Sequence, residues 1–331
     1  MDSVSGNVRK VFSFEMPERI PVAEWCMWWD KTLETWEAQG MPGGMDDFAL
    51  YDYFGLDKNM QFWLDHYSSE CPKPEHQSSG LITGEADYLR IRPHILREDA
   101  VSSLSAELNR AATLQISGEV VAWYTVNGFF WFPRELFGIE AHLYSFYDEA
   151  SLYHRICEDL LEWQLRRIDE LNAHTHFEFM TIAEDMSYNL GPMISLAVFE
   201  EFIAPYYKRL IPRIQQYGTK VFVDTDGNPA QMVPWLLDCG VDGIFPLERQ
   251  AGVDVAELRR QFPGLLMMGG FDKMCVLRGK DAIEAEIERL RPVVLSGGYI
   301  PAMDHQTPPG TTLEDYRHYV ALLRGLRGLA E

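Results

Sequence analysis

The chain has 331 residues, of which 47% are apolar, enough to bury a sizeable core in one large domain. Lys and Arg number 29 against 50 Asp and Glu, so the formal charge is −21, and the basic residues form no run. This charge excludes the electrostatic footprint of a nucleic-acid-binding protein and disfavours an anionic membrane surface as partner. No stretch approaches about 18 uncharged apolar residues, so we expect no membrane span.

The cysteines indicate the compartment. There are five, an odd number, and no CxxC pair occurs among them. Widely spaced cysteines of this kind are typical of reduced thiols in a cytoplasmic protein. The first 22 residues contain neither an apolar segment nor a cleavage site, so we expect no secretion signal.

Apolar runs and helical patterns alternate along the chain and predict one domain over residues 1–331. The predicted strands are 18–25, 59–67, 119–132, 178–184, 220–224, 242–246, 265–269 and 297–301. The predicted helices are 4–15, 31–40, 46–55, 97–114, 147–172, 195–218, 228–239, 252–262, 280–292 and 312–328. Eight strands alternating with helices are typical of an α/β TIM barrel, here preceded by an N-terminal helical extension.

Two segments call for local interpretation. Residues 68–95 carry Pro, Gly and Ser and then the alternating run EADYLRIRPHI, which predicts a β-hairpin at the rim of the barrel. The helix at 195–218 has Ser195 as its N-cap, and Pro205 and Pro212 should kink or split it.

The last five strands each end in polar or acidic residues. In a TIM barrel the residues that follow the strands converge on one rim, where active sites lie. The residues expected to meet there are Glu184, Asp224, Asp226, Glu248, Asp272 and His305.

For most of these residues the sequence leaves two interpretations open. Asp224 and Asp226 flank Thr225, so in an extended chain both carboxylates can reach one ligand; alternatively, one of them caps the following helix. Of Glu184 and Asp185, one should face the rim and the other a neighbouring helix, and we favour Glu184 for the rim.

Other candidates could bind a substrate or cofactor. Asp272 and Lys273 follow a Gly-Gly pair that lets a ligand approach the backbone, although an exposed turn has the same sequence. Arg134 could pair with a substrate carboxylate, or form a salt bridge at a helix start. Trp25, with the tryptophans that follow it, could form an aromatic wall that holds a cation, or pack into the core.

Several motifs together resemble the uroporphyrinogen decarboxylase superfamily over nearly the whole chain. They are ERIPV, EDMSYNLGPMISLAVFEEFIAPYYKRLI, GVDGIFPLE, GGFDK and DHQTPPGTTLEDYRHYV. The superfamily includes the decarboxylase itself and corrinoid-linked methyltransferases, and its fold is a distorted TIM barrel. Relatives of the decarboxylase type pair through their rims, so the resemblance also implies a homodimer.

The resemblance implies a ligand set for a metal. The methyltransferases bind zinc through His-x-Cys after the fifth strand and a Cys after the eighth. The corresponding positions here are Asp224, Asp226 and His305. Two carboxylates and one imidazole suit Mn²⁺ or Fe²⁺ better than Zn²⁺, or could bind a substrate amine with no metal.

The decarboxylase chemistry fits less well. The decarboxylase binds a substrate with many carboxylates through an arginine-bearing segment of the type RQAGRYLPEY after the first strand. Here that position reads VAEWCMWWDKTLETW, without arginine, and a rim of acids would repel such a substrate.

The leading hypothesis is therefore a methyltransferase that acts on a small methylated or amine-bearing substrate, with a corrinoid protein as partner. Asp224, Asp226 and His305 would bind a divalent metal or the substrate. Glu184, Glu248 and Asp272 are the catalytic candidates, with Glu184 or Glu248 as general base. Trp25, Arg134 and Lys273 are the cofactor-binding candidates. The alternatives are a decarboxylase or lyase for a small non-porphyrin acid, and a non-catalytic barrel that binds a corrinoid or another ligand.

Overall fold

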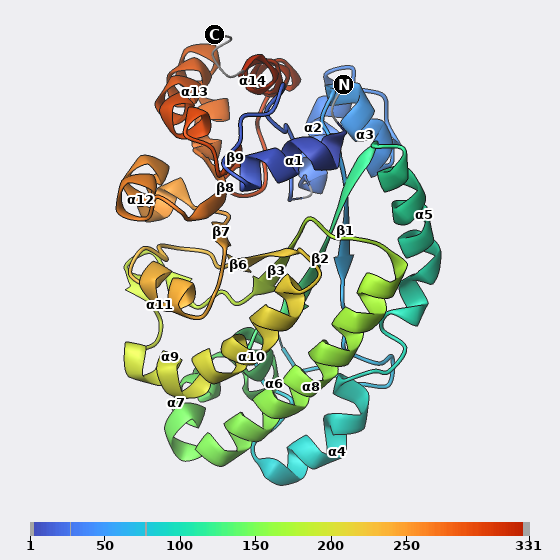
Figure 1. The fold of residues 1–331 in the computed structure, drawn as a ribbon, viewed down its shortest axis with the longest axis vertical. Helices are drawn as coiled ribbons and strands as arrows, with labels where there is room; N and C mark the ends of the chain where they lie inside the picture. Colours follow the sequence, from blue (N-terminus) through green and yellow to red (C-terminus); the bar gives the residue numbers. More distant parts are fainter. Residues whose placement is uncertain (1–2, 27, 77, 327–331) are drawn as a thin grey trace.

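Seven parallel strands form one curled sheet with helices around it, as in a distorted TIM barrel (Figure 1). The computed structural model describes residues 3–26, 28–76 and 78–326. The sheet order is β1-β2-β3-β6-β7-β8-β9, so each strand lies beside the next one along the chain. The strands are β1 Lys58–Trp63, β2 Val120–Asn127, β3 Phe179–Ala183, β6 Lys220–Asp224, β7 Gly243–Phe245, β8 Leu266–Phe271 and β9 Tyr299–Met303. Strands β4 (Ser187–Tyr188) and β5 (Gly191–Pro192) form a separate two-residue antiparallel pair.

The prediction of a strand at 18–25 is wrong, because this segment does not form the regular backbone hydrogen bonds of a strand in the sheet. The segment runs beside β1, where Val22 O accepts a hydrogen bond from Asp57 N and the Glu24 carbonyl accepts one from the Asn59 amide. Pro21 has no N–H to donate, and the Val22 N–H bonds the Asp57 side chain instead of a strand backbone. Side-chain bonds thus replace the regular ladder at this eighth position, and among the described residues seven strands join the sheet.

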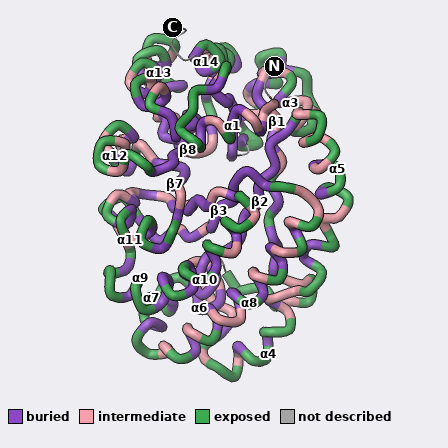
Figure 2. Tube along the Cα trace, viewed as in Figure 1, coloured by how far each residue is buried: buried purple, intermediate pink, exposed green. Residues whose placement is uncertain are grey.

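The interior of the barrel is filled by alternate residues of the strands and is closed at its amino end by a helix. Helix α1 (Val4–Phe12) places Val8, Val11 and Phe12 against this interior, and the Gly298 amide before β9 donates to Val11 O. The strand residues of this cluster are Val121, Trp123, Phe179, Phe222, Phe245, Leu266, Met268, Ile300 and Ala302. The buried course of the strands contrasts with the exposed outer sides of the helices (Figure 2). The N-terminal helical extension is therefore a plug for the barrel.

The helices pack outside the sheet and around its ends, mostly as predicted. Their bounds are α2 Asp30–Ala38, α3 Asp47–Phe54, α4 Glu85–Ile95, α5 Ser105–Ile116, α6 Trp131–Phe137, α7 Ile139–Asp148, α8 Ala150–His174, α9 Leu196–Phe202, α10 Ala204–Gln215, α11 Val233–Asp238, α12 Val255–Gln261, α13 Lys280–Leu295 and α14 Leu313–Gly325. Three short 3₁₀ turns join them: η1 Ser102–Leu104, η2 Arg249–Ala251 and η3 Lys273–Leu277. The end of the helix predicted at 312–328 lies outside the described residues. Within the described parts of the chain, no helix combines the length and apolar character needed to cross a membrane.

The predicted rim hairpin at 68–95 is wrong, because its alternating run is helix α4. Tyr88, Ile91 and Ile95 lie three and four residues apart and are all buried, so they form one apolar helix face. Glu85 and Asp87 stand in the first turn, where acidic side chains favour the helix dipole. The polar residues between the apolar ones made this segment of the sequence look as though it alternated with the period of two of a strand.

The predicted split of the helix at 195–218 is confirmed at Pro205, whereas Pro212 lies inside α10, which continues to Gln215. Ser195 caps α9 by accepting a hydrogen bond from Val198 N, and the helix ends at Phe202. A new helix, α10, begins at Ala204 with Pro205 in its first turn, where the missing N–H costs nothing.

Glu24 should make stability depend on pH. Burial raises its pKa to about 8, although the Tyr316 hydroxyl donates to it. The folded state therefore holds this proton more tightly than the unfolded state, whose glutamate titrates near its usual value. The contribution to stability is complete below about pH 4 and is lost as pH rises towards 8, at most about 5 kcal/mol in all. Calorimetric unfolding between about pH 5 and 9 should show a flatter decline for Glu24→Gln than for the unmodified protein; parallel curves would contradict this.

Candidate functional site

The polar residues predicted from the strand ends do gather at one end of the sheet, but in a different combination. The loops after β3, β6, β7, β8 and β9 meet at the carboxyl end of the strands, opposite the α1 plug. Among the described residues, three side chains there come close enough to share one metal ion: Asp226, Glu248 and His305.

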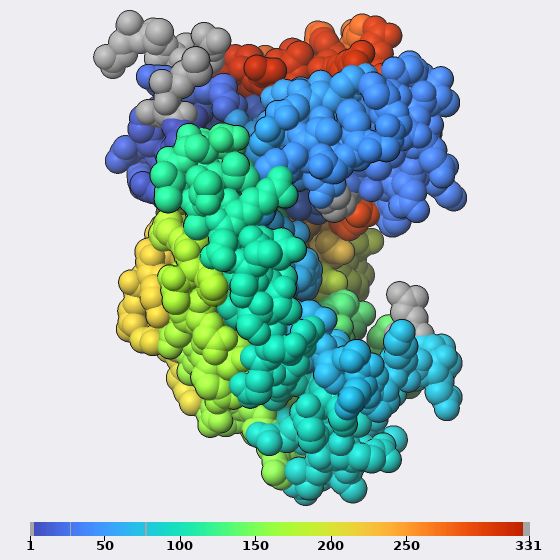
Figure 3. All heavy atoms as spheres, turned by 90° about the vertical axis from the view of Figure 1, so that its right-hand side faces the viewer, coloured from blue at the N-terminus to red at the C-terminus, as the bar shows by residue number. Residues whose placement is uncertain are grey.

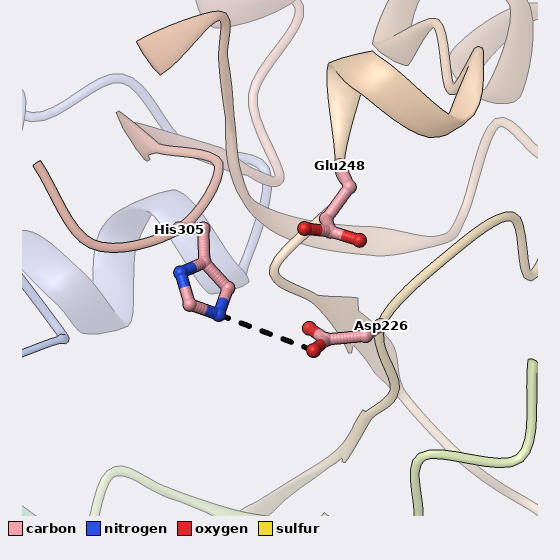
Figure 4. Close-up of side chains that lie close together, drawn as sticks. All are labelled: Asp226, Glu248 and His305. Carbon is pink, nitrogen blue, oxygen red and sulfur yellow. Dashed lines mark ion pairs between the residues drawn. The ribbon is translucent and has the colours of Figure 1, made fainter. Parts of the chain in front are cut away.

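These three residues, the rim triad, converge from three separate loops (Figure 4). One ligand atom from each lies within 4.8 Å of the other two. His305 Nε2 is 3.9 Å from Asp226 Oδ2. Two carboxylates and one imidazole at this spacing form a donor set that a divalent cation can bridge.

Glu248 is oriented by backbone and side-chain contacts. Its Oε2 accepts a hydrogen bond of 2.9 Å from Gly227 N, and its Oε1 lies 3.4 Å from Lys273 Nζ. Gly227 has φ +82°, and a Cβ there would lie 2.5 Å from Tyr188 Cα. Only glycine fits this turn, and the turn directs the Gly227 N–H at Glu248.

Asp304 connects the loops that carry the rim triad. It is fully buried and accepts hydrogen bonds from Arg249 N (2.7 Å) and Lys273 N (3.2 Å). Burial raises its pKa to about 6. The residue before His305 therefore holds in place the loops after β7 and β8, which supply Glu248 and Lys273.

The crowded carboxylates change the charge state of the site. Burial, together with Asp185 and Glu248, raises the pKa of Asp226 to about 7. Burial, and then the charge of Lys273, lowers the pKa of His305. Neutral imidazole is the form that binds metals, and a cation among these oxygens would relieve their mutual repulsion.

Asp224 is not part of the triad, so the predicted set of Asp224, Asp226 and His305 is corrected. Asp224 ends β6, on the same side of the strand as the interior residue Phe222. Burial and the charges of Asp185 and Asp226 raise its pKa well above the usual range. The group of three that could share a metal ion instead includes Glu248, which we predicted as a general base.

The choice of Glu184 over Asp185 for the rim is also corrected. The Glu184 carboxylate is fully buried and accepts hydrogen bonds from the backbone N–H of three consecutive residues, Phe129–Trp131, and from the Tyr207 hydroxyl. Asp185 instead lies in the site, where its Oδ1 is 3.3 Å from Asp226 N. Side-chain alternation along β3 could have shown this, because Phe179 and Thr181 face the interior whereas Ile182 faces the outer core.

Of the remaining predicted residues, some have a structural role and others lie in or beside the site. Trp25 packs edge-on against Trp123 and Phe179 in the barrel interior, so the core interpretation applies. One oxygen of Asp272 accepts a hydrogen bond from Met274 N and so caps the turn η3, and its other oxygen contacts Arg278. Both oxygens are therefore occupied by residues that do not belong to the rim triad. Lys273 reaches the triad through Glu248.

Arg134 lines a cavity of about 720 Å³ at the carboxyl ends of β1 and β2. We call it the α6 cavity. Its walls come from the loop after β1 and from α6, and they comprise Tyr67, Ser68, Ser69, Cys71, Pro72, Lys73, Pro74, Ser79, Leu81, Trp131, Arg134, Glu135, Gly138 and Ile139. The cyan segment after β1, which forms one wall of the cavity, lies on the side of the molecule that faces the viewer in Figure 3. Sequence reasoning missed the cavity, because its walls are far apart along the chain.

Comparison with known proteins gives a family. The family model described as Uroporphyrinogen decarboxylase (URO-D) matches residues 99–326, more than half of the chain. No curated protein sequence matches.

Two solved structures show distant likeness. A putative vitamin-B12-independent methionine synthase from Listeria monocytogenes has 13% sequence identity and a TM-score of 0.49, covering 95% of this chain and 98% of that one. A D-psicose 3-epimerase has 13% identity and a TM-score of 0.37, covering 67% of this chain and 84% of that one. Similarity at this level says nothing about activity.

The two neighbouring acids after β3 should respond differently to amide substitution. Glu184→Gln replaces an acceptor oxygen with an NH₂ group that faces backbone donors, so we expect a loss of about 2–4 kcal/mol in unfolding free energy. Asp185→Asn keeps an acceptor for Asp226 N and tolerates the positive φ of 43°, so stability should change by less than about 1 kcal/mol. Urea unfolding of both variants measures the difference, and a larger loss for Asp185→Asn would refute the assignment.

Proposed function

We propose that this chain, which belongs to the uroporphyrinogen decarboxylase family, is a metal-dependent methyltransferase that acts on a small methylated or amine-bearing substrate. The observation that carries the proposal is the rim triad of Asp226, Glu248 and His305 at the carboxyl end of the barrel. The family includes methyltransferase-like members, and Asp226 and His305 stand at two positions where the motif comparison puts their metal ligands.

The donor set supports a hard or borderline divalent ion. Carboxylate oxygens and one imidazole nitrogen suit Mn²⁺, Fe²⁺ or Zn²⁺, whereas a thiolate set would favour zinc more strongly. Three protein ligands leave coordination positions for a substrate atom. A cation bound here would act as a Lewis acid on a substrate heteroatom and so could activate it for methyl transfer.

The protein groups around the triad have separate tasks in this proposal. Gly227 N and Lys273 orient Glu248, while Asp304 holds the loops that carry it. Burial raises the pKa values of Asp185, Asp224 and Asp226, so a substrate with a cationic nitrogen beside them would favour their charged forms. A corrinoid carried by a partner protein would serve as the methyl carrier.

Measurements of metal binding can distinguish the rim triad from the ligand set that was predicted from sequence. After loading with Mn²⁺ or Zn²⁺ and removal of free ion, elemental analysis should find stoichiometric metal in the unmodified protein. Glu248→Gln and His305→Ala should weaken binding at least about tenfold, since each removes a ligand. Asp224→Asn is the matched control and should keep its metal.

All of these variants should melt like the unmodified protein, because the triad lies outside the hydrophobic core. Metal lost from Asp224→Asn but kept in Glu248→Gln would reinstate the sequence-based set. Absence of metal from the unmodified protein would refute the metal-dependent mechanism.

The reaction class can be tested with free methylcobalamin in place of the partner. Metal-loaded protein should speed the loss of methylcobalamin absorbance in the presence of small thiols or amines, and His305→Ala should abolish the acceleration. Uroporphyrinogen III should not be decarboxylated, because its carboxylates would meet Asp185, Asp224 and Asp226. Conversion of uroporphyrinogen to coproporphyrinogen would instead establish the decarboxylase reaction.

A further inference from the structure

The α6 cavity contains a guanidinium that has no acidic partner. The chain has 50 acidic and 29 basic residues, so a carboxylate is usually close to any arginine. Within the described residues, however, no carboxylate lies at ion-pair distance from Arg134, whose guanidinium stacks over the Trp131 ring at 4.8 Å. Stacking fixes the plane of the guanidinium and leaves its N–H donors for a ligand.

The next residue, Glu135, gives the same cavity a fixed carboxylate. Its Oε2 accepts hydrogen bonds from the Asn127 amide (2.8 Å) and the Tyr67 hydroxyl (3.1 Å), and His66 Nε2 lies 3.6 Å away. All the hydrogen bonds that the described residues make to this side chain go to Oε2. The other oxygen, Oε1, is therefore left as an acceptor on a carboxylate whose position is fixed.

We propose that the α6 cavity binds a small zwitterion, a molecule with a carboxylate and an ammonium group such as an amino acid or its N-methylated derivative. The ligand carboxylate pairs with Arg134 and the ammonium group with Glu135. A planar guanidinium can bind a carboxylate through two parallel hydrogen bonds, which a lysine could not do. Trp131, Leu81 and Ile139 supply apolar surface for the rest of the ligand.

The cavity lies at the carboxyl ends of β1 and β2, and the rim triad stands on the loops after β6, β7 and β9, so both are at the same end of the sheet. This inference specifies the substrate class of the proposed methyltransferase and rests on that proposal for the chemistry that follows binding. Binding itself requires only the cavity.

Calorimetric titration of the metal-free protein tests the proposal with three probes that share a phenylethyl group. L-phenylalanine carries both charges, 3-phenylpropanoate only the carboxylate, and phenethylamine only the ammonium group. We expect phenylalanine to bind at least about tenfold more tightly than either of the others, as two charge-assisted contacts require.

Variants assign each charge to its residue. Arg134→Gln should weaken phenylalanine and 3-phenylpropanoate at least about tenfold and leave phenethylamine unchanged. Glu135→Gln, which keeps an acceptor for Tyr67 and Asn127, should weaken phenylalanine and phenethylamine instead. Arg110→Gln is the matched control, because Arg110 also stacks on an aromatic ring, Phe48, but lies on exposed α5 away from the cavity.

The outcomes separate this proposal from the proposed function. Equal binding of the three probes, no binding of phenylalanine, or equal weakening by Arg110→Gln and Arg134→Gln would overturn the zwitterion site. His305→Ala should leave phenylalanine binding unchanged in the metal-free protein. A protein that binds phenylalanine as expected but takes up no metal would keep the zwitterion site and lose the metal-dependent reaction.

Discussion

The carboxylate of Glu184 joins the end of β3 to the beginning of α6, and both halves of the candidate site depend on this junction. Its hydrogen bonds to Phe129, Phe130 and Trp131 hold three successive N–H groups at the helix start. A Cβ at Gly128 would lie 1.9 Å from Cδ of Glu184, so only glycine lets the backbone come this close to the carboxyl group. The same junction presents Arg134 and Glu135 to the α6 cavity and turns the next residue, Asp185, towards the rim triad.

The acids at the carboxyl end thus divide into those that hold the loops and those that face a ligand. Glu184 and Asp304 are buried and bonded to backbone N–H groups, which explains how carboxylates can lie in an apolar region. Asp226 and Glu248 remain partly accessible beside His305. Glu184 holds the loop after β2, and Asp304 holds the loops after β7 and β8, so buried acids fix the surroundings of the ligand-facing acids.

Much of the fold could be predicted from sequence, because strands buried on both faces are near-continuous apolar runs and the segments between them have helical periodicity. The exceptions have local causes. In α4 the polar residues imitated alternation, and at 18–25 Pro21 and the Asp57 side chain replaced the ladder. The site was predicted to the level of the rim, since topology brings strand ends together. To predict that Asp185 and not Glu184 faces the rim, one has to know which side of β3 each side chain points to. To predict that Glu248 and not Asp224 joins the triad, one has to know the geometry of the loops, which the sequence does not contain.

The plug formed by α1 also constrains how the chain reaches its native state. The Gly298 amide donates to Val11 O, and Phe12 shares the barrel interior with Ile300. The first helix and the last strand therefore complete the same core, with nearly the whole chain between them. Contacts so distant in sequence cannot form until synthesis is almost finished, and until then the aromatic barrel interior around Phe12 lacks the residues of β9. Folding of this barrel is consequently a late, non-local event, during which exposed aromatic surface makes the nascent chain prone to aggregate.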